Sequence, residues 1–187
     1  MNEIPSFISI YDDALDKKDC IKIINEFEQN KEKQINGRVG DYEVKLKVKK
    51  SIDINHNFND KTLTSDLLSS CLKYHIQKYK KDFPDINKLP PWRCTSVYNV
   101  QKYNPKDGFF KSHCEVSDRS SSIRILVWMI YLNTLQDGGT LFPTYQTGIR
   151  AKQGRLVMWP SYWTHMHKGQ ISPTETKYIA TGWYEFS

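Results

Sequence analysis

The sequence changes character near residue 91, and this change limits the folds that the chain can adopt. The stretch FPDINKLPP at residues 83–91 contains three prolines and ends a helical pattern. Beyond it, short runs rich in β-forming residues follow one another, separated by turn signals such as Asp107-Gly108. Several short strands without helices between them are typical of a sandwich or barrel. We therefore predict a β-barrel over residues 92–187.

Two segments of the first 90 residues have the spacing of an amphipathic helix. In residues 15–33, the side chains of Cys20, Ile24 and Phe27 fall on one helical face. Residues 65–81 repeat this pattern with Leu68, Leu72, Ile76 and Tyr79. Both segments are predicted to be helices that pack on the barrel.

Between these helices, the run YEVKLKVKK alternates apolar and basic residues and predicts a half-buried strand. Its solvated face would carry Lys45, Lys47 and Lys49. This lysine face and the net charge of +6 are compatible with an anionic polymer. Lysines on an edge strand also prevent aggregation between sheets, which is the alternative reading.

The length of 187 residues allows one domain with a real core. We expect a single α+β domain over residues 1–187, with 1–91 as mainly helical support and 92–187 as the catalytic core. No stretch approaches the ~18–20 apolar residues of a membrane span, and the N-terminus does not read as a secretory signal. The four cysteines form no C-x-x-C pair, so free thiols in a reducing cytoplasm are expected. The many Lys, Asn and Ile residues suggest that this is the cytoplasm of a microbe or of a phage-infected host.

A possible metal site begins at His113 and Glu115, which one residue separates in a segment predicted as a strand. Alternate side chains of a strand share a face, so these two can converge on one ion. His165 and His167 follow some fifty residues later. Two histidines and one carboxylate make the facial triad of non-haem Fe(II) oxygenases, which leaves positions open for a co-substrate and O₂. An H-x-E pair alone also occurs by chance on solvated strands, and the pattern leaves open which later histidine is the ligand.

Lys177 lies ten residues beyond His167 in another predicted strand, where it shares a face with Ile179, Thr181 and Trp183. A lysine on an inward face is costly unless it pairs with an anion. A dicarboxylate co-substrate would supply that anion. The alternative is a lysine that extends to solvent from the end of the strand.

These residues belong to a longer pattern that resembles the 2-oxoglutarate/Fe(II)-dependent oxygenases, specifically their prolyl 4-hydroxylase-like branch. The order and spacing match over about residues 93–186. The matching positions are Tyr103, His113, Glu115, Arg124, Tyr131-Leu132-Asn133, Gly138-Gly139-Thr140-Leu141-Phe142-Pro143, Gly154-Arg155, His167-Lys168-Gly169, Lys177 and Trp183. The family usually has H-x-D, whereas Glu115 keeps the carboxylate on a side chain one methylene longer.

The resemblance implies a double-stranded β-helix, or jelly-roll, barrel supported by the N-terminal helices. It implies that His113, Glu115 and His167 hold Fe(II), with His165 in a supporting or substrate-facing role. In the same way it implies that Lys177 pairs with the distal carboxylate of 2-oxoglutarate. Tyr103 and Tyr131 would donate hydrogen bonds to this co-substrate and Trp183 would wall the pocket. Arg124, on the opposite strand face from Tyr131, is expected to be structural.

The function implied is a dioxygenase that uses Fe(II), 2-oxoglutarate and O₂, assisted by ascorbate, to hydroxylate a prolyl residue of a peptide or protein. The alternatives are a nucleic-acid dealkylase, a hydroxylase of a small metabolite, and a catalytically silent metal-binding jelly-roll module. Two polar segments, residues 115–122 and 49–61, are expected to act as lids over the substrate.

Overall fold

The computed structural model describes residues 6–40 and 43–187, which form two β-sheets and two α-helices. The helices are α1 (Lys17–Gln29) and α2 (Leu63–Asp82). The strands are β1 (Ser9–Tyr11), β2 (Ile35–Asn36), β3 (Ile52–Asn57), β4 (Trp92–Cys94), β5 (Val97–Tyr103), β6 (Arg124–Tyr131), β7 (Gly139–Phe142), β8 (Thr147–Arg150), β9 (Leu156–Pro160), β10 (Lys168–Gln170) and β11 (Lys177–Phe186).

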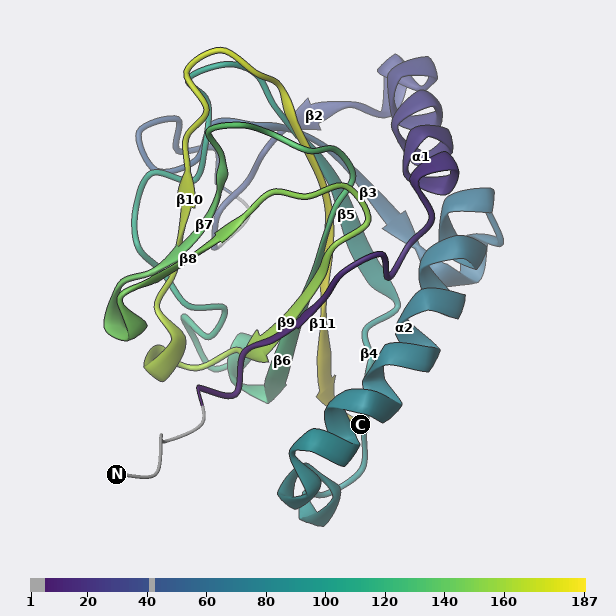
Figure 1. Ribbon diagram of the computed structural model, residues 1–187, viewed down its shortest axis with the longest axis vertical. Coiled ribbons are helices and arrows are strands. Elements are labelled where there is room, and N and C mark those ends of the chain that lie inside the picture. Colours follow the sequence, from purple (N-terminus) through teal and green to yellow (C-terminus); the bar gives the residue numbers. More distant parts are fainter. Residues whose placement is uncertain (1–5, 41–42) are drawn as a thin grey trace.

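The larger sheet has the order β1-β9-β6-β11-β5-β3-β2, with β4 also paired to β11, and the smaller sheet has the order β10-β7-β8. All pairings between these strands are antiparallel. Figure 1 shows α1 and α2 on one side of the larger sheet and the smaller sheet on the other. This is the predicted double-stranded β-helix with supporting helices, although the two sheets do not close into a barrel.

Two clusters of buried side chains follow from this arrangement. One lies between the helices and the larger sheet, and α1 contributes Cys20, Ile23 and Phe27 to it. Ile24 of the predicted apolar face is only partly buried. The four predicted apolar residues of α2 are buried in the same cluster, so both helices are confirmed. The second cluster lies inside the jelly roll and contains Tyr103, Tyr131 and Ile179.

The strand predicted for YEVKLKVKK is wrong where the structure describes it, and Tyr42 lies outside the described residues. Residues 43–50 contain a turn, and Val44 and Leu46 are exposed. The Lys50 N–H donates to Gly108 O and the Phe110 N–H donates to Val48 O. These backbone groups thus find partners in the segment ahead of His113 rather than in a sheet ladder.

Lys49 does not belong to a solvated lysine face, because its side chain is buried. Its ammonium lies 2.6 Å from the carboxylate of Asp53, which is buried as well. The alternating pattern therefore wrongly predicted that Lys49 is exposed to solvent. Without Lys49 and without a strand, there is no continuous lysine face along residues 43–50 to support an anionic polymer as partner.

The first 91 residues supply strands as well as helices, which the sequence patterns missed. β1 pairs with β9, and β3 pairs with β5 along six residues. Because β3 lies inside the larger sheet, residues 49–61 are not a lid over the substrate. Within the described part of the chain, neither helix is long and apolar enough to cross a membrane.

Candidate active site

His113 and Glu115 lie in an extended segment that passes close to the segment around His167. His113 and His167 form an isolated antiparallel bridge, in which each N–H donates to the other's carbonyl at 2.9 and 2.8 Å. The Glu115 N–H donates to Ser161 O at 3.0 Å. The segment is not a strand as predicted, but its extended backbone still directs His113 and Glu115 to the same side.

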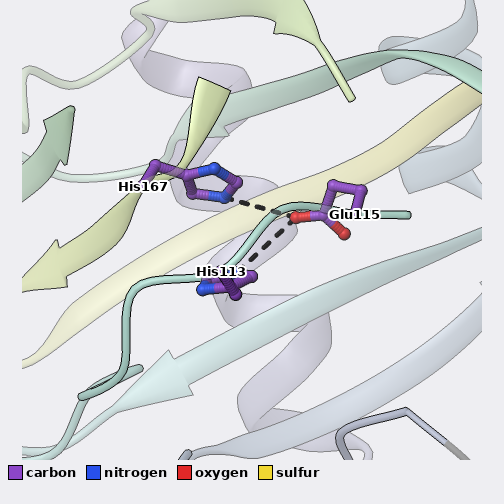
Figure 2. Close-up of side chains that lie close together, drawn as sticks. All are labelled: His113, Glu115 and His167. Atoms are coloured by element: carbon purple, nitrogen blue, oxygen red, sulfur yellow. Dashed lines mark ion pairs between the residues drawn. The ribbon is translucent and has the colours of Figure 1, made fainter. Parts of the chain in front are cut away.

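The three side chains converge, as Figure 2 shows, with the carboxylate of Glu115 between the two imidazole rings. Oε1 of Glu115 lies 3.6 Å from Nε2 of His113 and 3.3 Å from Nε2 of His167. One ligand atom from each residue lies within 4.8 Å of the others, so this group can hold a metal ion.

The backbone sets the tautomer of both histidines. Nδ1 of His113 lies 3.1 Å from Lys111 O, and Nδ1 of His167 lies 2.9 Å from His165 O. A carbonyl accepts only from a protonated nitrogen, so the proton of each neutral ring lies on Nδ1. Nε2 of both rings is then unprotonated and directed at the shared space, as metal ligation requires.

The donor set fits a six-coordinate metal ion that keeps three positions open. Two ligand atoms bonded to a metal at about 2.1 Å and at right angles lie about 3 Å apart. The separations of 3.3 and 3.6 Å from Oε1 of Glu115 are near this value. Two imidazole nitrogens and one carboxylate oxygen on one face correspond to the facial triad of non-haem iron sites.

The charge of Glu115 is maintained by its neighbours. Burial alone would raise the pKa of this carboxyl, but the hydrogen bonds and positive charges that His113 and His167 supply when their rings are protonated outweigh burial and hold the pKa well below its usual range. The carboxyl of Glu115 is therefore ionised at neutral pH.

Aromatic side chains hold the two imidazole rings in place. The ring of Phe109 stacks on His113, with centroids 3.6 Å apart and planes inclined by 12°. Trp159 and Phe142 pack against His167 with centroids 5.0 and 5.6 Å away.

His165 does not join the cluster, although the sequence left it open as a ligand. It ends the short 3₁₀ helix Trp163–His165, and its Nε2 lies 2.7 Å from Ser6 O and 3.1 Å from the hydroxyl of Tyr145. Burial lowers the pKa of His165, so its ring is neutral at neutral pH. Its contacts tie the N-terminal segment to the rest of the molecule.

Lys177 starts β11 directly opposite Tyr103 of β5, and only 6% of its surface is exposed. Its Nζ lies above the Tyr103 ring, 4.8 Å from the centroid. Among residues 6–40 and 43–187, no carboxylate forms an ion pair with this ammonium. A buried cation without an acidic partner is costly, so the arrangement favours an anionic ligand.

Both predicted tyrosines are buried beside this lysine's strand. The hydroxyl of Tyr103 donates to Oε1 of Gln101 at 2.7 Å, and the hydroxyl of Tyr131 lies 2.7 Å from Oγ1 of Thr140. Burial raises the pKa of both tyrosines, so both hydroxyls remain protonated donors.

A buried polar network behind Tyr103 was missed by the sequence patterns. Nε2 of Gln101 donates to Oδ2 of Asp53 at 3.2 Å, and Asp53 also accepts from Ser51 and pairs with Lys49. Because Asp53 accepts from the amide nitrogen of Gln101, the amide oxygen is turned toward Tyr103. Nothing in the local sequence pattern indicates this network, because its members come from two strands and a turn.

Trp183 and Arg124 both contact Glu115 directly. Nε1 of Trp183 donates to Oε2 of Glu115 at 2.9 Å, and Arg124 donates to the backbone O of Glu115 at 3.1 Å. The pairing of β6 with β11 shifts register between Tyr184 and Glu185, so strand parity does not hold at Arg124.

Three comparisons place this geometry among known proteins. Residues 98–185, which include all three converging side chains, match the family model described as the 2OG-Fe(II) oxygenase superfamily. A search of curated protein sequences gives no significant match.

Several solved structures share the fold at low sequence identity. Viral collagen prolyl hydroxylase from Paramecium bursaria chlorella virus-1, in complex with 2OG, superposes with a TM-score of 0.73 at 18% identity, covering 97% of each chain. A prolyl hydroxylase from Trichoplax adhaerens, bound to a hypoxia inducible factor peptide, superposes with a TM-score of 0.76 at 16% identity. The alignment covers 96% of this chain and 84% of the Trichoplax chain. A Pseudomonas putida prolyl-4-hydroxylase superposes with a TM-score of 0.72 at 16% identity, and the alignment covers 96% of this chain and 93% of the Pseudomonas chain.

At these identities the solved structures establish the double-stranded β-helix fold. The family match adds the type of chemistry that the fold carries here, and the His-Glu-His cluster can hold the metal that this chemistry needs. Residues 98–185 therefore carry a 2OG-Fe(II) oxygenase domain, and the protein is a dioxygenase that depends on Fe(II) and 2-oxoglutarate.

Proposed function

We propose that this dioxygenase hydroxylates a prolyl residue of a peptide or protein. In this proposal His113, Glu115 and His167 bind Fe(II), and Lys177 binds the distal carboxylate of 2-oxoglutarate. The observation that carries it is the combination of the convergent His-Glu-His cluster with a buried ammonium that has no acidic partner among the described residues. The prolyl substrate is supported by the three prolyl hydroxylases that share the fold.

Each residue has a defined task in the reaction. Bound Fe(II) and 2-oxoglutarate supply the oxidising chemistry that places one oxygen atom of O₂ in a C–H bond, with succinate and CO₂ as co-products. Glu115 and the two histidines would hold the metal, and a triad of this kind would leave positions open for co-substrate and O₂. Lys177 fixes the far end of the co-substrate and neutralises its charge in a site with little water.

Tyr103 and Tyr131 are proposed as hydrogen-bond donors to 2-oxoglutarate. Each hydroxyl now bonds a neighbour inside the protein, Gln101 or Thr140, and would exchange that bond when the co-substrate binds. The indole of Trp183, which donates to Glu115, would form a wall of the co-substrate pocket. The segment of residues 115–122, which begins at Glu115, is proposed as the lid over the substrate.

The proposal also includes the organisation of the chain. Residues 1–187 act as one domain, in which residues 1–91 support the catalytic core of residues 92–187. The packing of α1 and α2 on the larger sheet supports this. A reducing cytoplasm is proposed as the compartment, since Cys20, Cys71, Cys94 and Cys114 are all unpaired.

The test uses matched peptides that differ at one position. Protein, Fe(II), 2-oxoglutarate, ascorbate and O₂ are incubated with proline-rich peptides, and with the same peptides carrying alanine in place of proline. We expect succinate formation together with a mass gain of one oxygen atom, located on proline by fragmentation. His167→Ala is the inactive control. Equal turnover of the alanine peptides would refute the prolyl substrate.

Two further substrate sets separate the alternatives. Oligonucleotides with methylated bases test a dealkylase, and free amino acids test a small-metabolite hydroxylase. Turnover in either set, without hydroxylation of proline peptides, would keep the cofactor chemistry and replace the substrate. Fe(II) binding without turnover of 2-oxoglutarate or of any of these substrates would replace the proposal by a catalytically silent metal-binding jelly-roll module.

A further inference from the structure

The two carboxylate oxygens of Glu115 have different partners. Oε1 faces both imidazole nitrogens at 3.3 and 3.6 Å, whereas Oε2 accepts the indole N–H of Trp183 at 2.9 Å. A hydrogen bond to one oxygen keeps the carboxylate from rotating about its axis. Oε1 is therefore the oxygen presented to the metal position.

Trp183 is itself held in place by Arg124. The guanidinium carbon of Arg124 lies 3.9 Å from the centroid of the Trp183 ring, in a cation–π stack. The same guanidinium donates through Nη1 to the backbone O of Glu115 at 3.1 Å. The three residues thus form a closed set of contacts, in which Arg124 fixes the backbone of Glu115 and the ring that fixes its side chain.

We propose that Arg124 and Trp183 are positioning residues that make Glu115 a ligand through one oxygen. The inference rests on the proposed function, because it concerns the same metal site. A carboxylate that binds through both oxygens occupies one coordination position more, which would leave too few for a bidentate co-substrate and O₂. Glutamate needs this restraint more than aspartate, because its extra methylene adds one rotatable bond.

The restraint also matches the length of the side chain. Replacing Glu115 by aspartate shortens the side chain by one C–C bond of about 1.5 Å. A shorter carboxylate that keeps its contact with the histidines no longer reaches the indole of Trp183 at hydrogen-bond distance. The positioning role proposed for Trp183 therefore requires a glutamate, and not an aspartate, at position 115.

Cobalt(II) is a suitable probe, because its visible absorption reports coordination number and its binding needs neither O₂ nor substrate. Trp183→Phe removes the N–H and keeps a ring for Arg124. We expect Co(II) binding to weaken by about 10-fold or more, as for other residues that orient metal ligands, with a changed visible spectrum. Trp128→Phe is the matched control, since Trp128 lies in the cluster beneath the helices. Its Co(II) affinity should stay within about twofold of the parent.

A double-mutant cycle shows whether Trp183 acts through Glu115. In the Glu115→Asp background, Trp183→Phe should change Co(II) affinity by less than about twofold. An equal loss in both backgrounds, or parent-like affinity and spectrum in folded Trp183→Phe, would overturn the inference.

Arg124→Lys gives an independent reading, because lysine keeps the charge but not the planar stack. We expect it to share the spectral change of Trp183→Phe with a smaller loss of affinity, and a parent-like spectrum would contradict the role of Arg124. A parent that binds no Co(II) would overturn the metal site itself. A parent that binds Co(II) normally, with no effect of Trp183→Phe, would overturn only the positioning role.

Discussion

Replacing Lys177 by methionine should stabilise the protein in the absence of its co-substrate. Burial lowers the pKa of Lys177 from its ordinary value of 10.5 to about 8, and no carboxylate of the described residues pairs with it. At ~1.4 kcal/mol per pH unit, the gap between these two values corresponds to about 3 kcal/mol. Methionine fills similar space without a charge, so it should remove this cost.

The pH dependence has a definite sign. The pKa is lower in the folded state, so the unfolded state binds the proton more tightly and the cost is fully present below about pH 8. It decreases as the pH rises from about 8 towards 10.5, and it disappears above that value. The advantage of Lys177→Met should thus fall from about 3 kcal/mol at pH 7 to roughly half of this at pH 9.5.

Urea unfolding of parent and variant at the two pH values measures this difference, because all other groups titrate alike in both proteins. Lys102→Met is the matched control. Lys102 lies on the neighbouring strand and pairs with Glu28 at 2.7 Å, so its loss should not stabilise the protein. A variant that is less stable than the parent at pH 7, by an amount independent of pH, would refute the reasoning.

The same variant should lose the response to 2-oxoglutarate. With Co(II) present, co-substrate at about 100 times its Kd should stabilise the parent by about 2.7 kcal/mol. Most of this gain should be missing in Lys177→Met, because the carboxylate then lacks its buried partner. The unfolding experiment and the co-substrate experiment together distinguish an anion-binding lysine from one that is merely buried.

Three other changes have expected outcomes of different kinds. Asp53→Asn leaves the buried ammonium of Lys49 without its charge partner and should cost about 3–5 kcal/mol in urea unfolding, whereas replacing both residues by apolar ones should restore most of the loss. His165→Ala should lower the free energy of unfolding by about 1–3 kcal/mol, because it removes the hydrogen bonds to Ser6 and Tyr145. The same variant should keep its Co(II) affinity, and loss of Co(II) binding would show that His165 is a ligand. Gly182→Ala would place Cβ 2.7 Å from the Trp128 ring and should lower the thermal midpoint, and an unchanged midpoint would show that the ring can move.

Residue spacing predicted the metal cluster for a reason that does not depend on regular strands. His113 and Glu115 point the same way because their backbone is extended and bonded to His167 and Ser161, although no strand forms there. Side chains alternate along any extended backbone, and the sequence could indicate an extended backbone at this segment. The choice between His165 and His167 needed the family resemblance, because residues two apart on an extended backbone point to the same side.

The same kind of alternation failed where tertiary contacts decide the backbone. The lysines near residue 47 alternate with apolar residues, but the segment turns and pairs with the backbone ahead of His113. Lys49 then becomes buried against Asp53, a contact that needs two distant backbones in place. The short strands β1, β2 and β10 have two or three residues each, which is too few to show a period.

Arg124 shows how a single irregularity removes a residue from sequence prediction. Strand parity placed it away from Tyr131, and the register shift at the end of β11 brings it to Trp183 and Glu115. No local feature of the sequence marks this shift. The contacts around Glu115 could thus be found only from the folded chain.

The most direct test of the account is the visible absorption of the protein with Fe(II) and 2-oxoglutarate in the absence of O₂. We expect a metal-to-ligand charge-transfer band when the co-substrate chelates iron at the site of His113, Glu115 and His167. The band should vanish in His167→Ala, persist in His165→Ala, and require more 2-oxoglutarate in Lys177→Ala. A parent that binds Fe(II) without developing this band, or a band that survives His167→Ala, would contradict the account.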